Sequence, residues 1–455
     1  MPDQDFCVPI RALGPAVAVR GDPDYDAILP HLSWNQRLAT ARRPAAVVPV
    51  STAEEVSAAV RAARHSGRRI SPRGGGHNYQ AAAVRDDVVL LDLTGLDRVE
   101  IDRSTRRAQV GAGVRGGDLL ERLSAEGFAF PVGHCADVPL SGYILSGGFG
   151  WNSGRWGPAS ASVEAVDLVL ADGSIVRASP GEHPDLFWAA RGAGAGFFAV
   201  VTGYELRLHD LPQATHSINA AWNADSVPVL ADWLTEAVRA AADGSEITIL
   251  VGPHHATGEP AISLHAAATA DSARRAREMI DPLAHPPATA LQIDAVARED
   301  IAFAALTKLS AMPGGKRVAA DHAWCDGAVG DLLVALQPLA GVPTKMSSIN
   351  IFALGGNGAY ALPPDAHGSA LSRGGATGVG IYALWDDPDD DARLQQWVRD
   401  VDVALAGFRT GRYVGEADLT AAPGRRAECF TPDALARLDE VREAYDPEGV
   451  FARWP

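Results

Sequence analysis

Three consecutive glycines, Gly74–Gly76, stand directly before His77 in the stretch SPRGGGHNYQ. A run of three glycines loses more conformational entropy on folding than any other triplet, so it is expected where the backbone needs a positive φ or lies against a ligand. The preceding RRIS is typical of a short strand, which places the triplet at a strand-to-loop junction. The chain must therefore fold so that the backbone of this loop lies against a ligand or another segment, and His77 is the next side chain along the loop.

Length and charge narrow the possible partners. At 455 residues the chain is long enough for at least two domains with full cores. Its formal net charge is −16 and it has no basic run of five or more residues, which argues against nucleic acid as a partner. The apolar stretches AAVVPV and FFAVV are too short to span a membrane, and MPDQDFCVPIRALG lacks the features of a signal peptide. We expect a soluble, cytoplasmic protein without membrane or nucleic-acid partners, and the sequence does not indicate its oligomeric state.

The cysteines predict neither disulfides nor a metal centre. Cys7, Cys135, Cys325 and Cys429 are scattered along the chain without a CxxC pair. This spacing does not fit a disulfide framework or a zinc site, and no metal is expected. A cysteine with a special role must owe it to its neighbours.

Strand-like and helix-like segments alternate along the chain. AAVVPV is typical of a buried strand, and Ser51 with Glu54 should open the next helix as a capping box. AVDLVLADGSIVRAS is typical of a hairpin, with Asp172-Gly173 in a type I′ turn. From about Pro212, segments such as EITILVG and TGVGIYALW alternate with helix-like ones, which indicates one large sheet backed by helices. The sequence predicts an α+β protein.

A literal GxGxxG occurs at Gly111, Gly113 and Gly116, between a strand and a helix, as in a dinucleotide-binding fingerprint. A Rossmann unit also needs a second parallel strand that ends in an acidic residue, whereas FAFPVGHC ends in His134 and Cys135. We therefore favour a structural role for this motif over an NAD site, although its glycines could contact a cofactor.

A second glycine-rich segment, residues 131–157 (PVGHCADVPLSGYILSGGFGWNSGRWG), contains Cys135. The order RGGGH, GHC, GYILSGGFG and GAGAGFFAVVTGYELRL resembles the FAD-linked oxidases of the vanillyl-alcohol oxidase superfamily, and the nearest branch resembles the berberine-bridge-enzyme-like oxidases. The resemblance runs from Pro44 to Leu208 and resumes at YDPEGVF near the end of the chain.

This resemblance implies a two-domain fold of the PCMH type. Residues 1–210 and a returning tail, 409–455, would form the FAD-binding domain, and residues 211–408 a substrate-binding domain with a large antiparallel sheet. His77 matches the histidine that bonds the flavin 8α-methyl group, and Cys135 matches the cysteine that bonds flavin C6, as in the doubly linked subgroup. The alternatives are a loop histidine that contacts FAD without a bond and an inert buried thiol.

The resemblance also implies FAD contacts around both loops. The N–H groups of the triplet could bind the pyrophosphate, which would place His77 beside the dimethylbenzene edge. The residues expected to contact FAD are Arg73, Gly74, Gly75, Gly76, Asn78, Gly113, Gly133, His134, Val138, Ser141, Gly142, Leu145, Gly147, Gly148, Gly150, Val200 and Tyr413.

The catalytic base is the main departure from the family pattern. Related carbohydrate oxidases carry Tyr-Val-Asn-Tyr-x-Asp, with the second tyrosine as base, and the matching stretch here is YVGEAD. Tyr413 and Asp418 match, Gly415 replaces the asparagine, and Glu416 stands at the base position. A carboxylate whose pKa is raised by burial can act as a base. Our hypothesis is that Glu416 is the base and that Tyr413 lines the ring; alternatively, Glu416 binds a cationic or polyhydroxyl substrate, or is a solvated charge.

Together these observations predict an FAD-dependent oxidase that takes a hydride from an alcohol, sugar or secondary-metabolite C–H bond and is reoxidised by O2 to give H2O2. The alternatives are a dehydrogenase of the same fold with another electron acceptor, and a flavin- or ligand-binding protein that has lost catalysis. Tyr143, Tyr382 and Trp385 could face the substrate or lie in the core. The sequence does not identify the substrate.

Overall fold

The glycine triplet follows directly from a small sheet. The computed structural model describes residues 4–308, 310, 313–341, 344–356, 358–361 and 368–454. In the first sheet β2, β4 and β3 are parallel and β1 is antiparallel to β2. Its strands, in spatial order, are β1 (Ala18–Val19), β2 (Ala46–Pro49), β4 (Val89–Asp92) and β3 (Ile70–Arg73). Because β3 ends at Arg73, Gly74–Gly76 lie at the carboxyl end of a parallel strand, where ligands bind in open α/β sheets.

The predicted capping box exists, one residue further along. Helix α4 (Ala53–His65) has Thr52 as its N-cap, and Thr52 exchanges hydrogen bonds with Glu55. The prediction of Ser51 and Glu54 was therefore wrong in register. Ser51 still contributes, because its backbone N–H and hydroxyl both donate to Glu55 Oε2.

The second sheet is antiparallel throughout. Its strands, in spatial order, are β5 (Val99–Asp102), β6 (Arg107–Gly111), β10 (Val200–Arg207), β8 (Val163–Val169) and β9 (Ile175–Ala178). The β8–β9 hairpin was predicted, but its turn is not type I′. A type I′ turn needs positive φ at both central residues, whereas Gly173 (φ +84°) has it and Asp172 does not. The Asp172 carboxylate instead accepts hydrogen bonds from the backbone and hydroxyl of Ser174.

An eight-stranded sheet forms the other half of the molecule and is antiparallel throughout. Its strands, in spatial order, are β15 (Gln292–Ile301), β12 (Ala214–Asn223), β14 (Pro260–Ala270), β13 (Glu246–Pro253), β17 (Ser348–Leu354), β18 (Thr377–Trp385), β16 (Arg317–Cys325) and β19 (Arg409–Gly411). The predicted α+β fold with a large antiparallel sheet is confirmed.

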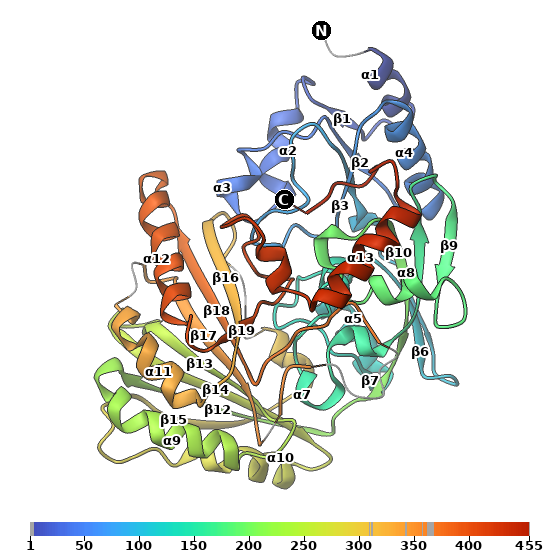
Figure 1. The fold of residues 1–455 in the computed structure, drawn as a ribbon. Helices are drawn as coiled ribbons and strands as arrows, with labels where there is room; N and C mark the ends of the chain where they lie inside the picture. Colours follow the sequence, from blue (N-terminus) through green and yellow to red (C-terminus); the bar gives the residue numbers. More distant parts are fainter. Residues whose placement is uncertain are drawn as a thin grey trace.

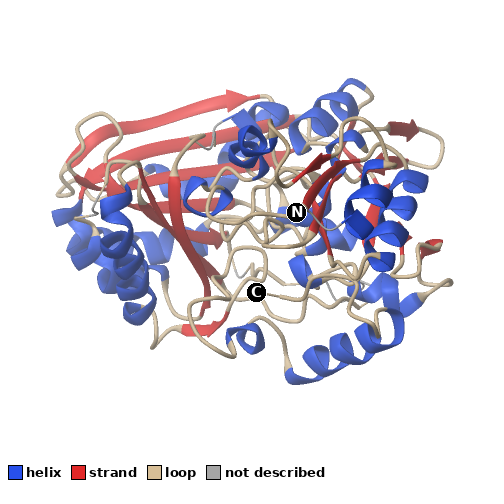
Figure 2. Cartoon of the chain, turned by 90° about the horizontal axis from the view of Figure 1, so that it is seen from above, coloured by secondary structure: helices blue, strands red, loops and turns tan. Residues whose placement is uncertain are grey.

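The two faces of this sheet have different surroundings. Side chains alternate between faces along each strand, so Ile249 and Ile381 pack in the core beneath the helices, whereas Asn350 and Tyr382 point to the opposite face. The helices on the core side are α9 (Val227–Ala240), α10 (Ala273–Ile280), α11 (Val329–Leu336) and α12 (Asp391–Ala404). Figure 2 shows loops gathered between the long strands and the smaller sheets.

The end of the chain returns to the first half of the molecule. Helix α13 (Pro432–Tyr445) lies against α8 (Pro184–Ala189), where Arg437 pairs with Asp185 at 2.7 Å (Figure 1). Further on, Phe451 forms a parallel bridge with Ile70 on β3. The remaining helices and strands are α1 (Gln4–Arg11), α2 (Tyr25–Leu32), α3 (Gln36–Ala39), α5 (Gly116–Ala125), β7 (Phe128–Ala129), α6 (Leu140–Leu145), α7 (Ser153–Trp156) and β11 (His209–Asp210). Within the described residues, no helix has both the length and the apolar character needed to cross a membrane.

Candidate active site

A cavity of about 1030 Å³ lies between the glycine-rich loops and the open face of the eight-stranded sheet. One wall comes from the loop at 73–79 and the segment at 133–149, and the opposite wall from β13, β14 and β17. The tail closes it at Tyr413 and Glu416. The volume is at the upper end of the range for small-molecule sites, so the cavity has room for a cofactor and a substrate.

The glycine triplet presents free backbone donors to this cavity. Gly75, Gly76, His77 and Asn78 line it, and no described residue accepts a hydrogen bond from their four N–H groups. Gly76 has a φ of +72°, and a Cβ there would lie 2.4 Å from the carbonyl oxygen of Leu32. Only glycine fits at this position, and successive unpaired N–H groups in such a turn form an anion-binding concavity.

His77 and Cys135 face the same cavity from different loops. His77 Nε2 lies 3.2 Å from Asp137 Oδ2, and this contact lowers the pKa of the Asp137 carboxyl. No described residue gives His77 Nδ1 a hydrogen-bond partner. Cys135 is a free thiol, and burial, together with the charges of Asp137 and Glu416, raises its pKa to about 12. Asp137, two residues after Cys135, was not among the predicted site residues.

Most of the residues expected to contact FAD line the cavity, and five do not. Those in the lining are Arg73, Gly74, Gly75, Gly76, His77, Asn78, Gly133, His134, Cys135, Val138, Ser141, Gly142, Leu145 and Tyr413. Those outside it are Gly113, Gly147, Gly148, Gly150 and Val200. Side chains alternate between the two faces of a strand. Ala199 and Val201 therefore face the cavity, and Val200 between them is fully buried on the other face.

The four glycines outside the lining allow close backbone packing. A Cβ on Gly113 would lie 2.3 Å from the carbonyl oxygen of Leu93, and one on Gly150 would lie 2.1 Å from that of Val132. Cβ atoms on Gly147 and Gly148 would meet side chains at 2.7 Å and 2.8 Å. The GxGxxG motif also lacks Rossmann geometry, because both neighbours of β6 are antiparallel to it.

Glu416 stands at the cavity wall with a defined hydrogen-bond donor. The Tyr382 hydroxyl donates to Glu416 Oε2 at 2.7 Å. Burial raises the pKa of Glu416 to about 7, against the lowering effect of this hydrogen bond. Asn78 Nδ2 donates to the Gly415 carbonyl at 3.3 Å, so the loop that carries His77 contacts the loop that carries Glu416.

The three aromatic residues considered from the sequence have different surroundings. Tyr382 and Tyr143 line the cavity, while Trp385 lies in the helix-covered core and donates to Asp391. Tyr413 lines the cavity too, and its hydroxyl accepts a hydrogen bond from Gly148 N–H at 3.3 Å. Burial raises the pKa of Tyr413 above its usual value, so its hydroxyl stays protonated at neutral pH.

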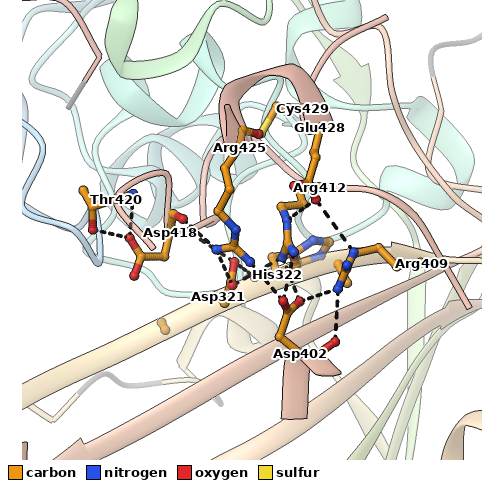
Figure 3. A network of polar contacts seen from close by, with 12 residues as sticks. Asp321, His322, Asp402, Arg409, Arg412, Asp418, Thr420, Arg425, Glu428 and Cys429 are labelled. Atoms are coloured by element: carbon orange, nitrogen blue, oxygen red, sulfur yellow. Dashed lines mark hydrogen bonds and ion pairs between the residues drawn. The ribbon is translucent and has the colours of Figure 1, made fainter. Parts of the chain in front are cut away.

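A buried ion cluster holds the tail loop against the sheet (Figure 3). Arg412 and Arg425 from the tail both pair with Asp321 on β16, at 3.3 Å and 2.7 Å, and with Asp402 on α12, at 2.9 Å and 3.1 Å. Asp321 Oδ1 also accepts the backbone N–H of Asp418. These contacts flank Tyr413 and Glu416 on both sides, so the cluster fixes the position of the loop between them.

The sheet wall of the cavity is polar but carries little charge. Asn350 and His265 line it, and His265 Nδ1 lies 2.7 Å from Asn219 Oδ1. His134 lines the cavity beside Cys135, and burial lowers its pKa to about 4, so it is neutral at pH 7. Among the described lining residues Arg73 is the one arginine or lysine, and it pairs with Asp92 at 3.0 Å. Asn350 and His265 were not among the predicted site residues because the strands that carry them lie far apart along the chain.

The chain is similar to known flavoproteins. Residues 44–179 match the FAD binding domain family. The FAD-linked oxidoreductase nodO of Hypoxylon pulicicidum is 29% identical over 416 residues, covering 89% of each chain. The crystal structure of 6-hydroxy-D-nicotine oxidase from Arthrobacter nicotinovorans is 27% identical, with a TM-score of 0.82 over 96% of this chain and 97% of that one. The berberine-bridge-enzyme-like protein 1 of Physcomitrella patens is 20% identical, with a TM-score of 0.85 over 98% and 97%.

The chemical groups that line the cavity fit FAD. The free N–H groups at Gly75–Asn78 suit a pyrophosphate, and the largely apolar lining suits a flat ring system. Those features lie partly within the matched residues 44–179. The chain is therefore an FAD-linked oxidoreductase with an FAD binding domain at residues 44–179, and it has the fold of the berberine-bridge-enzyme-like protein 1.

Proposed function

We propose that the chain holds FAD through covalent bonds to His77 and Cys135 and oxidises a C–H bond beside oxygen or nitrogen in an alcohol, sugar or secondary metabolite. The observation that carries the proposal is the Tyr382–Glu416 pair, which shares one cavity with His77 and Cys135. Bound FAD would supply the hydride acceptor. For an alcohol, the carbon loses a hydride and the hydroxyl loses a proton, which gives a carbonyl, and O2 finally takes both to give H2O2.

Glu416 is the base in this proposal. Its pKa of about 7 leaves the carboxylate substantially ionised at neutral pH and still basic enough to take a hydroxyl or amine proton. Tyr382 occupies Oε2 and thereby orients the carboxylate, so that Oε1 is the oxygen that meets the substrate. Tyr413, protonated and bound to Gly148, supports the wall of the cavity without exchanging a proton.

Each linking residue has a role that the cavity supports. Asp137 beside Nε2 of His77 favours the tautomer whose proton is on Nε2, so that Nδ1 keeps the lone pair needed for a bond to carbon. The Cys135 thiol is protonated at neutral pH and therefore needs a base to react, and Glu416, whose charge influences the thiol pKa, lines the same cavity.

Intact mass under denaturing conditions tests the linkage. The parent, His77→Ala and Cys135→Ala should each carry one FAD-sized increment, and the double variant should carry none. A parent with the bare polypeptide mass would refute the covalent part of the proposal.

Glu416→Gln tests the chemistry. This variant should bind the parent amount of flavin and lose about 100-fold or more in kcat/KM, the usual contribution of a general base. Flavin reduced by substrate without oxygen and then mixed with O2 should reoxidise within the turnover time. Slow reoxidation would favour a dehydrogenase, and flavin that no alcohol, sugar or phenol reduces would favour a ligand-binding protein.

A further inference from the structure

A group of metal-ligating side chains adjoins the cavity and includes none of the residues that were given a role above. His254 and His255 begin the loop that joins β13 to β14, and Asp294 lies on β15. One potential ligand atom from each of the three lies within 4.8 Å of the others. His255 and Asp294 line the cavity. The group is therefore at the sheet end of the cavity that contains Glu416.

The fold brings this group together in a defined way. Strands β12 and β14 lie between β13 and β15, so the loop at 254–259 must fold back over the sheet for His254 to reach Asp294. The loop is closed by hydrogen bonds from His254 N–H to the Glu259 carbonyl and from Gly258 N–H to the His254 carbonyl, both 2.8 Å. His254 is buried, with its side chain 3% exposed. Its position is thus set before any ion binds.

We propose that His254, His255 and Asp294 bind one divalent transition metal ion of the zinc class. Two imidazoles and a carboxylate are a ligand set that zinc and its neighbours prefer. His254 Nε2 and Asp294 Oδ2 are 2.9 Å apart, and two ligand atoms on a tetrahedral zinc ion are roughly 3.3 Å apart for bonds of about 2.0–2.1 Å. The pair therefore needs to open by only a few tenths of an ångström.

The other donor atoms are available. No described residue gives the ring nitrogens of His255 a hydrogen-bond partner, and its ring lies 4.5 Å from that of His254. His254 Nδ1 accepts a hydrogen bond from Thr257 N–H at 3.4 Å, and Thr257 Oγ1 lies 3.3 Å from the same nitrogen. Binding of the ion through Nε2 requires the ring proton on Nδ1, so that Nδ1 gives up the bond from Thr257 N–H and donates to the Thr257 hydroxyl, as zinc-bound histidines donate to their partners.

Three protein ligands would bind the ion and leave its fourth coordination position open toward the cavity. Zinc sites that bind a further ligand have this arrangement. An oxygen or nitrogen atom of a molecule in the cavity could take that position. The metal would then anchor one end of a substrate while Glu416 acts at the other end. This proposal does not depend on the flavin chemistry proposed above.

Calorimetric titration of the metal-stripped holoprotein with ZnCl2 tests the site. The parent should bind one equivalent of zinc. His255→Ala and Asp294→Asn should each lower the zinc affinity at least tenfold, and Thr257→Val should lower it about tenfold. The matched control is His285→Ala, because His285 forms an exposed pair with Asp281 at 3.2 Å, away from the cavity lining. That variant should bind zinc like the parent.

Two results would overturn the proposal. The first is a parent that binds no zinc at micromolar concentrations of the free ion. The second is zinc binding that His255→Ala and Asp294→Asn leave unchanged, which would mean that the His254–Asp294 contact only closes the loop. Flavin content and thermal unfolding of each variant show whether it is folded, and Asp294→Asn keeps the side-chain size should His255→Ala disturb the loop.

Discussion

Replacing Tyr382 with phenylalanine should shift the pH dependence of turnover without removing the base. The substitution deletes the donor to Glu416 Oε2, a hydrogen bond of 2.7 Å to a carboxylate. Hydrogen bonds to charged groups contribute about 1.5–3 kcal/mol, and one pKa unit corresponds to about 1.4 kcal/mol. The pKa of Glu416, about 7 in the parent, should therefore rise by about one to two units.

The sign of the effect follows from the role of the base. Only the ionised carboxylate accepts a proton, so kcat/KM of the parent should rise with pH through about 7. In Tyr382→Phe the rise in kcat/KM should come about one to two pH units higher than in the parent. At pH 7 kcat/KM should therefore fall roughly 5- to 50-fold, and it should largely recover at alkaline pH.

The assay is a steady-state pH profile of kcat/KM for both proteins with the same substrate, with flavin content measured alongside. A loss that is the same at every pH, with the rise still near that of the parent, would refute this reasoning. Such a result would mean that Tyr382 contacts the substrate or only fills space beside Val318 and Ala320.

The remaining predictions concern the base, the glycine triplet and the tail. Glu416→Gln should lower kcat/KM about 100-fold or more above pH 7, where the carboxylate of the parent is ionised, without the alkaline recovery of the tyrosine variant, as a steady-state profile would show. Gly76→Ala places a side chain in a left-handed conformation and its Cβ 2.4 Å from the Leu32 carbonyl oxygen, so the flavin-to-protein absorbance ratio should fall. The control is Gly181→Ala, whose Cβ has no atom within 4 Å and should leave the ratio unchanged. Arg412→Met removes one of the positive charges beside the buried carboxylates of Asp321 and Asp402, so the free energy of unfolding in urea should fall by about 3 kcal/mol. Arg274→Ala breaks an exposed pair with Glu278 and should lower it by less than about 1 kcal/mol. A destabilisation by Arg412→Met no larger than that of Arg274→Ala would contradict the positioning role of the ion cluster.

Local signals predicted much of the fold. The hydrophobic runs of β2, β13 and β18 and the helix patterns of α9 and α12 are properties of short segments, so each could be recognised alone. Two local details were wrong, the register of the capping box and the turn type at Asp172, because several polar residues at each place could form the hydrogen bonds. β15, in contrast, is polar and mostly exposed at the edge of its sheet, so its sequence has no clear strand pattern.

The sequence by itself predicted a close approach of the backbone at Gly74–Gly76, and Gly76 does occupy a conformation and a space that other residues do not tolerate. It also placed His77, Cys135 and Glu416 as candidates on three separate segments. Only the tertiary structure decided that these segments share one cavity, that Tyr382 is the partner of Glu416, and that Val200 faces away. The physical reason is that side-chain direction on a strand and contact between distant segments depend on how sheets and loops pack, which no single stretch of sequence contains.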